Sequence, residues 1–390
     1  MQNFVFYNPA KIIFGKGMEE KVGEEVSKYS VKKRVLFHYG GGSIKKNGVY
    51  DKVVQALKNN GIYFVELGGV VPNPRITKIY EGIQLCKEND LDFILAVGGG
   101  SVIDSAKGIA AGVKANGDIW DYYMEHADIS EALPIGVVLT IPAAGSESSN
   151  GSVVTNEEGA FKRDINSEHL IPKFAIMNPE TNYSLPAYQT ACGAADIIAH
   201  LMERYFAPET NVDFTDRLIE GAIQTVMNYA PLALEEPGNY DYRAELMWAG
   251  TIAHNSLLNT GRTGDWASHK MEHELSGIYD IAHGAGLTII FPAWMKYVYH
   301  ENIDKFVQFG TRILGVNYAA NEKERIVKET IYRMESFYQR IGLPIRLSEA
   351  GIGSEHIEEM AEKAVMQNPT IGAFKKLGKE DIVNVLNLAL

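Results

Sequence analysis

The pattern of apolar and polar residues changes near the middle of the chain. Up to about residue 180, short continuous apolar runs alternate with segments of helical spacing. Unbroken apolar strands separated by helices are typical of a parallel sheet that is covered on both faces. The runs that predict strands are Arg34–Tyr39, Tyr63–Glu66, Phe93–Val97 and Ile135–Thr140, with two shorter extended pieces at Phe4–Phe6 and Lys11–Phe14.

From about residue 185 onward, the apolar residues recur at helical spacing, as in Ala195, Ile198, Leu201 and Met202. The β-branched run Leu287–Phe291 lies inside a longer segment of the same periodicity, so it is predicted to be helical. We therefore predict two domains, an α/β domain with a parallel sheet over residues 1–183 and an all-α domain over residues 184–390.

Two of the predicted strands end in a Gly-Gly-Gly-Ser turn, at Gly40–Ser43 and Gly98–Ser101. Glycine lets a ligand approach the backbone, and the start of the following helix offers N–H groups and partial positive charge to a phosphate. A single turn of this kind also fits a tight connection without a ligand, and Ile103 replaces the third small residue of the usual dinucleotide fingerprint. Two such turns after two parallel strands favour a nucleotide-binding domain.

The first turn also bears on the choice of cofactor. NAD-selective folds commonly place a carboxylate near a strand end to bind the ribose 2′-hydroxyl. The segment Tyr39–Lys46 has no carboxylate and ends in Lys45 and Lys46, which would attract a 2′-phosphate. The pattern thus favours NADP over NAD, with solvated surface lysines as the alternative interpretation.

Several histidines gather in the helical half. Asp196 and His200 are four residues apart and share one helix face, His269 and His273 repeat the spacing, and His283 follows. One Asp and three His suit Fe²⁺ or Zn²⁺. Each histidine alone is more commonly a core or surface residue, so the metal hypothesis rests on their density. A zinc peptidase is excluded, because Lys270 follows the first histidine where that motif requires Glu.

Composition narrows the classes of partner and compartment. The chain has 390 residues, with 37 Lys+Arg and 49 Asp+Glu. The resulting net charge of −12 argues against a protein that binds nucleic acid. No stretch reaches the length of a membrane span. The two cysteines fit a reducing compartment, and the first residues lack the features of a signal peptide, so we expect a cytoplasmic protein.

Four motifs together carry a family resemblance: Tyr39–Lys46, Pro72–Arg75, Gly98–Lys107 and Glu272–Ser276. On these residues the sequence resembles the iron-containing (group III) alcohol dehydrogenases, and most closely their NADPH-dependent butanol dehydrogenase and aldehyde reductase branch. The resemblance extends from Phe14 to about Gly353.

The resemblance implies a two-domain architecture like that of dehydroquinate synthase, with an active site in the cleft between the domains. It implies that one divalent metal is held by Asp196, His200, His269 and His283, and that His273 lies beside it with a role in proton transfer. It also implies a homodimer, formed through the N-terminal residues around Phe4–Phe6. The implied cofactor contacts are Gly40, Gly41, Ser43, Gly99, Gly100, Ser101, Asp104, Thr140 and Lys162.

Two residues depart from the family's pattern. Ala144 stands where a hydroxyl often contacts the cofactor, and Ala282 stands where relatives often carry proline. Ser146, Ser148 or Ser149 could supply the hydrogen bond to the cofactor that Ala144 cannot make. Neither departure removes a predicted metal ligand.

The predicted reaction is hydride transfer between NADP(H) and a small primary alcohol or aldehyde, with Fe²⁺ as the expected metal and Zn²⁺ or Ni²⁺ as alternatives. Two enzymes of the same architecture are rivals, a zinc- and NAD-linked enzyme like glycerol dehydrogenase and a lyase like dehydroquinate synthase. The lyase would need basic groups for its polyanionic substrate, whereas the predicted metal region is rich in aromatic side chains. A non-catalytic nucleotide-binding or metal-storage protein would explain the glycine turns or the histidines, but not both.

Overall fold

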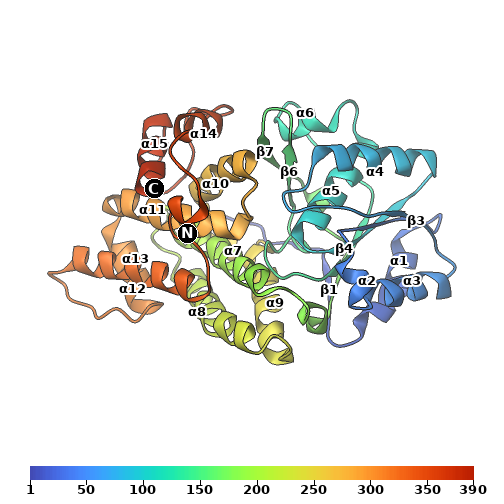
Figure 1. Ribbon diagram of the computed structural model, residues 1–390, viewed down its shortest axis with the longest axis horizontal. Coiled ribbons are helices and arrows are strands. Elements are labelled where there is room, and N and C mark those ends of the chain that lie inside the picture. Colours follow the sequence, from blue (N-terminus) through green and yellow to red (C-terminus); the bar gives the residue numbers. More distant parts are fainter. The chain divides into compact units, whose positions relative to one another are not determined.

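The computed structural model describes residues 1–390, and the chain divides into two compact units (Figure 1). The first, here called the α/β unit, contains Tyr7–Leu185 and Pro237–Asn255. The second, here called the helical unit, contains Met1–Phe6, Pro186–Glu236 and Ser256–Leu390. The segment Pro237–Asn255 therefore belongs to the α/β unit, although it lies in the half of the sequence that is predicted to be helical.

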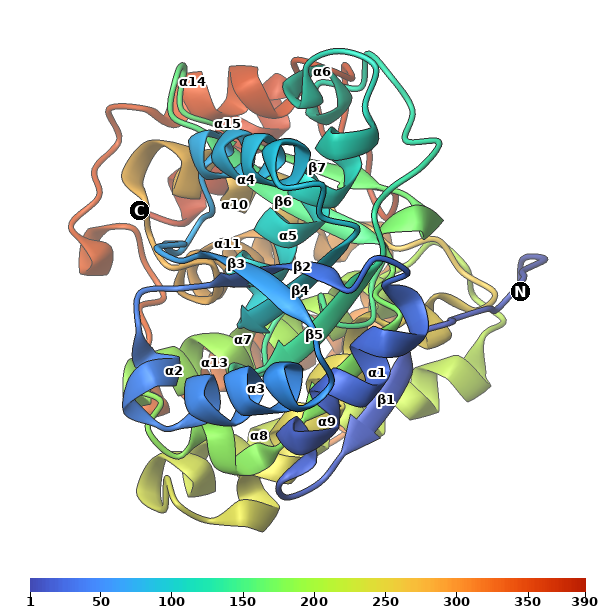
Figure 2. The same ribbon diagram turned by 90° about the vertical axis from the view of Figure 1, so that its right-hand side faces the viewer.

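The α/β unit is built on a six-stranded parallel sheet (Figure 2). The strands are β1 (Lys11–Phe14), β2 (Arg34–Tyr39), β3 (Tyr63–Leu67), β4 (Phe93–Gly98), β5 (Ile135–Leu139) and β8 (Phe174–Met177), in the order β1-β8-β5-β4-β2-β3. The parallel sheet and strands β1 to β5 confirm the prediction from the apolar runs. Strand β8 was not predicted, and Phe4–Phe6 forms no strand because it pairs with no other segment of this chain.

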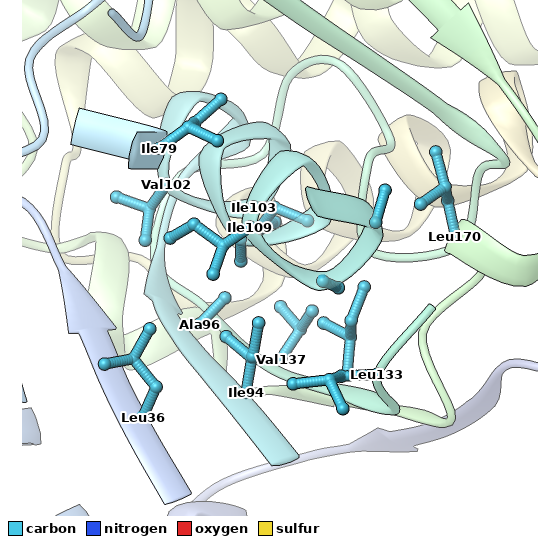
Figure 3. Packing of buried hydrophobic residues seen from close by; sticks show 14 of the residues in the cluster. Leu36, Ile79, Ile94, Ala96, Val102, Ile103, Ile109, Leu133, Val137 and Leu170 are labelled. Atoms are coloured by element: carbon cyan, nitrogen blue, oxygen red, sulfur yellow. The ribbon is translucent and has the colours of Figure 1, made fainter. Parts of the chain in front are cut away.

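The side chains of the central strands alternate between two apolar layers. Phe37 and Leu95 pack with α1 (Val22–Tyr29) and α3 (Val49–Asn59) on one face. Leu36, Ile94 and Ala96 pack with α4 (Ile76–Glu88) and α5 (Gly100–Lys114) on the other face (Figure 3). Because both faces are covered, a strand such as β4 needs apolar residues at every position, which explains its unbroken apolar sequence.

The order of the strands creates a switch point between β2 and β4. From β2 the chain continues to the outer strand β3, and it then returns to β4 on the other side of β2. The helix α3 that follows β2 and the helix α5 that follows β4 consequently cover opposite faces. Open parallel sheets bind ligands at such a point, beyond the carboxyl ends of the strands. Both glycine turns begin there, and the first leads into the short helix α2 (Ser43–Lys46).

The α/β unit has further elements outside the six-stranded sheet. Strands β6 (Gly151–Asn156) and β7 (Phe161–Asn166) form an antiparallel hairpin that was not predicted. The unit also contains α6 (Ile119–Tyr123) and α9 (Tyr240–His254). Helix α9 holds the long loop after β5, because Thr251 Oγ1 donates a hydrogen bond of 2.6 Å to Glu147.

The helical unit is organised around one buried helix, α7 (Ala187–Tyr205), in which every residue from Thr190 to Tyr205 is buried. The other helices are α8 (Asp213–Glu235), α10 (Ala267–Tyr279), α11 (His283–Val298), α12 (Ile303–Arg312), α13 (Lys323–Arg340), α14 (Ile357–Ala364) and α15 (Lys379–Leu388). The run Leu287–Phe291 lies within α11, which confirms that it is helical. None of the helices combines the length and the hydrophobicity that a membrane-spanning helix requires.

Candidate metal centre and nucleotide-binding edge

Three helices of the helical unit bring the four predicted metal ligands together. Helix α7 supplies Asp196 and His200, α10 supplies His269, and His283 is the first residue of α11. Asp196, His200 and His269 each offer a ligand atom within 4.8 Å of the others. His283 Nε2 lies 3.7 Å from Asp196 Oδ1.

The donor set of this centre fits a divalent metal ion. His269 Nδ1 makes a hydrogen bond of 2.7 Å to Glu203, whereas His269 Nε2 is buried and has no hydrogen-bond partner in the protein. A buried polar atom without a partner costs free energy unless a ligand satisfies it. Three imidazoles and one carboxylate are donors that Fe²⁺ and Zn²⁺ accept.

Two carboxylates at this centre, Glu203 and Glu272, were not predicted from the sequence. Glu203 follows Asp196 and His200 on the same face of α7 and accepts a hydrogen bond from His269 Nδ1. Glu272, on α10, is hydrogen-bonded to His283 Nδ1. The spacing of residues 196, 200 and 203 is a helical signal that could have revealed Glu203, and Glu272 belongs to a motif already singled out.

His273 lies beside the centre rather than among the ligands that surround Asp196. It is buried, and its ring centroid lies 5.8 Å from that of His283. It groups within 4.8 Å with Glu272 and His283, separately from the group of Asp196, His200 and His269. That His273 lies next to a metal without binding it stays a prediction, because Glu272, His273 and His283 form a second group that could itself hold a metal ion.

Asp265 fixes the segment that leads into α10. It accepts backbone hydrogen bonds of 2.7 Å from Ala373 and 2.6 Å from Phe374. Burial, together with the nearby charge of Glu203, raises the pKa of Asp265 to about 7. The start of α10, just before His269, is thereby tied to the loop around Phe374.

The glycine turns at the carboxyl edge of the sheet differ in what packs against them. A Cβ added at Gly99 would lie 2.8 Å from Ile141, so this turn needs glycine for its contact with the loop after β5. A Cβ added at Gly41 would meet nothing within 4 Å. No side chain caps the start of α5 at Gly99, which leaves backbone N–H groups of the first turn for an anion.

The other predicted cofactor contacts lie near these turns with partners of their own. Thr140 is buried, and its N–H donates to Gly98 O at 3.0 Å. Asp104 accepts hydrogen bonds from Ser146 Oγ at 2.6 Å and from the N–H of Val153 at 3.1 Å. Asp104 thus holds the loop after β5 against α5.

Two buried lysines complete this loop region. Lys107 Nζ donates to the backbone oxygens of Ser149 and Gly151, and burial lowers its pKa to about 8. Burial raises the pKa of Asp104, and the charge of Lys107 opposes this shift. Lys162, on the hairpin strand β7, donates to Asn73 Oδ1 at 3.0 Å.

Asn182 is a candidate ligand-binding residue that the sequence analysis missed. It closes the 3₁₀ turn Pro179–Asn182 after β8, at the same edge of the sheet, and the neighbouring Thr181 accepts a hydrogen bond from Asn47. The side chain is fully buried, yet neither its nitrogen nor its oxygen has a hydrogen-bond partner in the protein. An unsatisfied buried amide is costly, which points to a ligand that it contacts.

A carboxylate from β3 lies beside the first glycine turn. Lys45 Nζ lies 5.1 Å from the ring centroid of Tyr39 and 4.8 Å from that of Tyr50. Both tyrosine hydroxyls donate to Glu66, at 2.8 and 2.6 Å, and this bond raises the pKa of Tyr50 to about 12. The segment Tyr39–Lys46 itself has no carboxylate, but folding brings one to it.

Two cavities in the helical unit have volumes of about 620 and 650 Å³. Tyr188, Tyr279 and Leu343 are among the residues that line the first, and Met227 and Phe337 are among those that line the second. None of the predicted metal ligands lines either cavity.

The fold and the site define a protein with a nucleotide-type parallel sheet and an Asp/His₃ centre on a helical unit. Residues 9–179 match the family model described as iron-containing alcohol dehydrogenase. Residues 190–390 match the model described as the C-terminal part of the Fe-containing alcohol dehydrogenase family. The chain belongs to the iron-containing alcohol dehydrogenase family, a family of alcohol oxidoreductases, and this confirms the resemblance that its motifs carry.

Relatives match over almost the full length. The chain is 43% identical over 390 residues to the probable NADH-dependent butanol dehydrogenase 1 of Bacillus subtilis, covering 100% of both chains. It is 36% identical over 366 residues to the NADPH-dependent aldehyde reductase YqhD of Escherichia coli, covering 93% of each. The crystal structure of NADH-dependent butanol dehydrogenase A from Thermotoga maritima superposes with a TM-score of 0.95 at 43% identity, covering 100% of this chain and 99% of that one.

The arrangement predicts different metal contents for variants of two histidines on the same helix. His269→Ala removes an imidazole from the Asp196 group, so the variant should retain well under half of the wild-type metal after reconstitution and dialysis. His273→Ala should retain wild-type metal content, because His273 lies outside that group. Elemental analysis of the folded proteins measures both. Equal metal content in the two variants would contradict the assignment.

Proposed function

We propose that the protein is a metal-dependent alcohol dehydrogenase and aldehyde reductase that transfers hydride between NADP(H) and a small primary alcohol or aldehyde. The observation that carries the proposal is the convergence of the buried Asp196, His200 and His269, with the partly buried His283 placing its Nε2 3.7 Å from Asp196 Oδ1. The names of the butanol dehydrogenase and aldehyde reductase relatives support the substrate class. Fe²⁺ is the proposed metal, and Zn²⁺ or Ni²⁺ suits the same donors.

The proposed chemistry divides between the bound groups and the side chains of the chain. A divalent metal, when bound, supplies a Lewis acid that polarises the carbonyl group of the substrate. The three histidines and Asp196 would hold it, and a bound nicotinamide cofactor would supply or accept the hydride. His273 is the proposed general acid, whose imidazole delivers a proton to the substrate oxygen during aldehyde reduction and takes it back during alcohol oxidation.

The cofactor is proposed to bind at the carboxyl edge of the sheet. The backbone of Gly40, Gly41, Gly99 and Gly100 and the uncapped start of α5 would receive its phosphates. The side chains proposed to contact it are Ser43, Ser101, Asp104, Thr140 and Lys162, and Asn182 joins them because its buried amide has no partner in the protein.

The proposal also includes a preference for NADP over NAD. Lys45 and Lys46 favour a 2′-phosphate, whereas Glu66 places a negative charge beside Lys45. The relatives' names include both NADH and NADPH. We propose that Lys45 attracts the 2′-phosphate and that Glu66 weakens this attraction.

We also propose a cytoplasmic homodimer. Phe4, Val5 and Tyr7 are exposed by 52, 95 and 68%, which leaves apolar surface for a second copy of the chain to cover. Cys86 and Cys192 are both free and buried, as fits a reducing compartment.

The test of the proposed reaction is oxidation of NADPH with butanal. Protein is stripped of metal and then reloaded anaerobically with Fe²⁺ or Zn²⁺, because loss of the Lewis acid should abolish turnover and reloading should restore it. The rate is followed by the absorbance of NADPH and compared with that of NADH. His273→Ala, reloaded in the same way, should keep its metal and lose most turnover at neutral pH, since it lacks the general acid.

No turnover with either metal, in protein that binds both metal and NADPH, would contradict the proposed reaction. Full activity of His273→Ala would remove His273 from proton transfer while leaving the rest of the proposal in place.

The position of Glu66 predicts a change in cofactor preference. Glu66→Gln removes an exposed negative charge next to Lys45, so the ratio of kcat/KM for NADPH to that for NADH should rise about 2- to 5-fold, as expected for an exposed charge pair. The control is Asp90→Asn, which removes an exposed carboxylate that is paired with Lys32 just ahead of β4, at the amino end of the strand. An unchanged ratio in Glu66→Gln would contradict the role of Glu66.

A further inference from the structure

Two buried carboxylates outside the predicted ligand set are hydrogen-bonded to the Nδ1 atoms of two predicted metal-binding histidines. We propose that Glu203 and Glu272 are positioning residues that fix the ring orientation and the tautomer of His269 and His283, so that each Nε2 is presented to the metal. The inference rests on the metal centre of the proposed function, and it assigns a role to two residues that lie outside that centre's own ligands.

Glu203 controls which nitrogen of His269 is free. Its Oε1 accepts a hydrogen bond of 2.7 Å from His269 Nδ1 and one of 3.0 Å from the backbone N–H of the same residue. Both oxygens of Glu203 accept from backbone N–H groups, so Nδ1 is the donor in its bond to this carboxylate and Nε2 carries the lone pair. Nε2 is the buried atom of this ring that has no partner in the protein.

The same carboxylate joins two of the helices that carry ligands. Its second oxygen accepts from the N–H of Trp266, which precedes the first residue of α10 with a positive φ of 65°. Glu203 therefore satisfies two N–H groups at the start of α10 that have no partner within the helix. Because Glu203 belongs to α7, the bond fixes the position of His269 relative to Asp196 and His200 on that helix.

Glu272 connects α10 and α11 in the same way that Glu203 connects α7 and α10. It is fully buried and is hydrogen-bonded to His283 Nδ1 through one oxygen and to Ser276 Oγ through the other. The close approach of the helices requires Gly286, where an added Cβ would lie 2.6 Å from Glu272 Oε1. Its bond leaves His283 Nε2 facing Asp196 Oδ1 at 3.7 Å.

These contacts predict an effect on the metal itself. A carboxylate that accepts from the distal nitrogen of a metal-bound histidine fixes the ring and makes it a stronger donor. The two carboxylates also add negative charge near a cation site. Both effects act on metal affinity, whereas a purely structural role for the same hydrogen bonds would act on the free energy of unfolding alone.

The experiment measures the affinity of metal-stripped protein for Co²⁺ and Zn²⁺ by competition with a chelator. Glu203→Gln and Glu272→Gln keep the size of the side chain and remove its charge, and each should weaken binding about 10- to 100-fold. The visible spectrum of bound Co²⁺ should also change, because the geometry of the histidine ligands changes.

The matched control is Glu220→Gln. Glu220 is another buried carboxylate of the helical unit, and it accepts from the hydroxyl of Tyr205 at 2.9 Å and pairs with Arg312. The control should lower the unfolding temperature while leaving metal affinity and the Co²⁺ spectrum unchanged.

Circular dichroism first establishes that each variant is folded, and the two positions provide independent tests if one variant does not fold. Wild-type affinity and spectrum in folded Glu203→Gln or Glu272→Gln would overturn the role of that residue. Failure of the wild-type protein to bind Co²⁺ or Zn²⁺ would instead overturn the metal centre of the proposed function. The two failures are therefore distinguishable.

Discussion

The helical unit depends on one constraint, which is that the ionisable side chains of the buried helix α7 need polar partners. Asp196, His200 and Glu203 lie on one face of a helix that is buried on all sides from Thr190 to Tyr205. Charged groups in such a place are stable only when they are paired or bind a metal. Their partners come from α10 and α11. The packing of these three helices therefore determines the geometry of the metal centre.

A corresponding constraint governs the α/β unit. Its central strands are apolar on both faces, so polar groups that bind a ligand gather where the strands end. Gly40, Gly99, Thr140 and Asn182 follow β2, β4, β5 and β8, four strands of one sheet. The long loop after β5 is held in place by Asp104 and Lys107 from α5 and by Thr251 from α9.

Local patterns in the sequence predicted much of this arrangement. The runs Arg34–Tyr39 and Phe93–Val97 predicted parallel strands, because a strand covered on both faces must be apolar throughout. The spacing of Asp196 and His200 placed both on one helix face, and the structure brings His269 and His283 to them.

The remaining features arise from contacts between distant segments. Glu66 becomes a neighbour of Lys45 only when the chain folds, so no linear pattern of residues revealed it. The helical spacing of Glu203 from Asp196 and His200 places it on their face of α7, but it does not show that His269 is its partner. Strand β8, a buried run of four residues, was not predicted, and Asn182 was missed with it. The segment Pro237–Asn255 lies in the range that was predicted to be helical, and this prediction does not indicate the unit to which α9 belongs.

The central claim is that one divalent metal is held by Asp196, His200, His269 and His283, with His273 beside it. The most direct measurement is X-ray diffraction from crystals of the metal-loaded protein, with anomalous scattering recorded at the absorption edge of the bound metal. The account predicts one anomalous peak within bonding distance of Asp196 and of the three histidine Nε2 or Nδ1 atoms. A peak bound instead by Glu272, His273 and His283, the neighbouring group of donors, would contradict it.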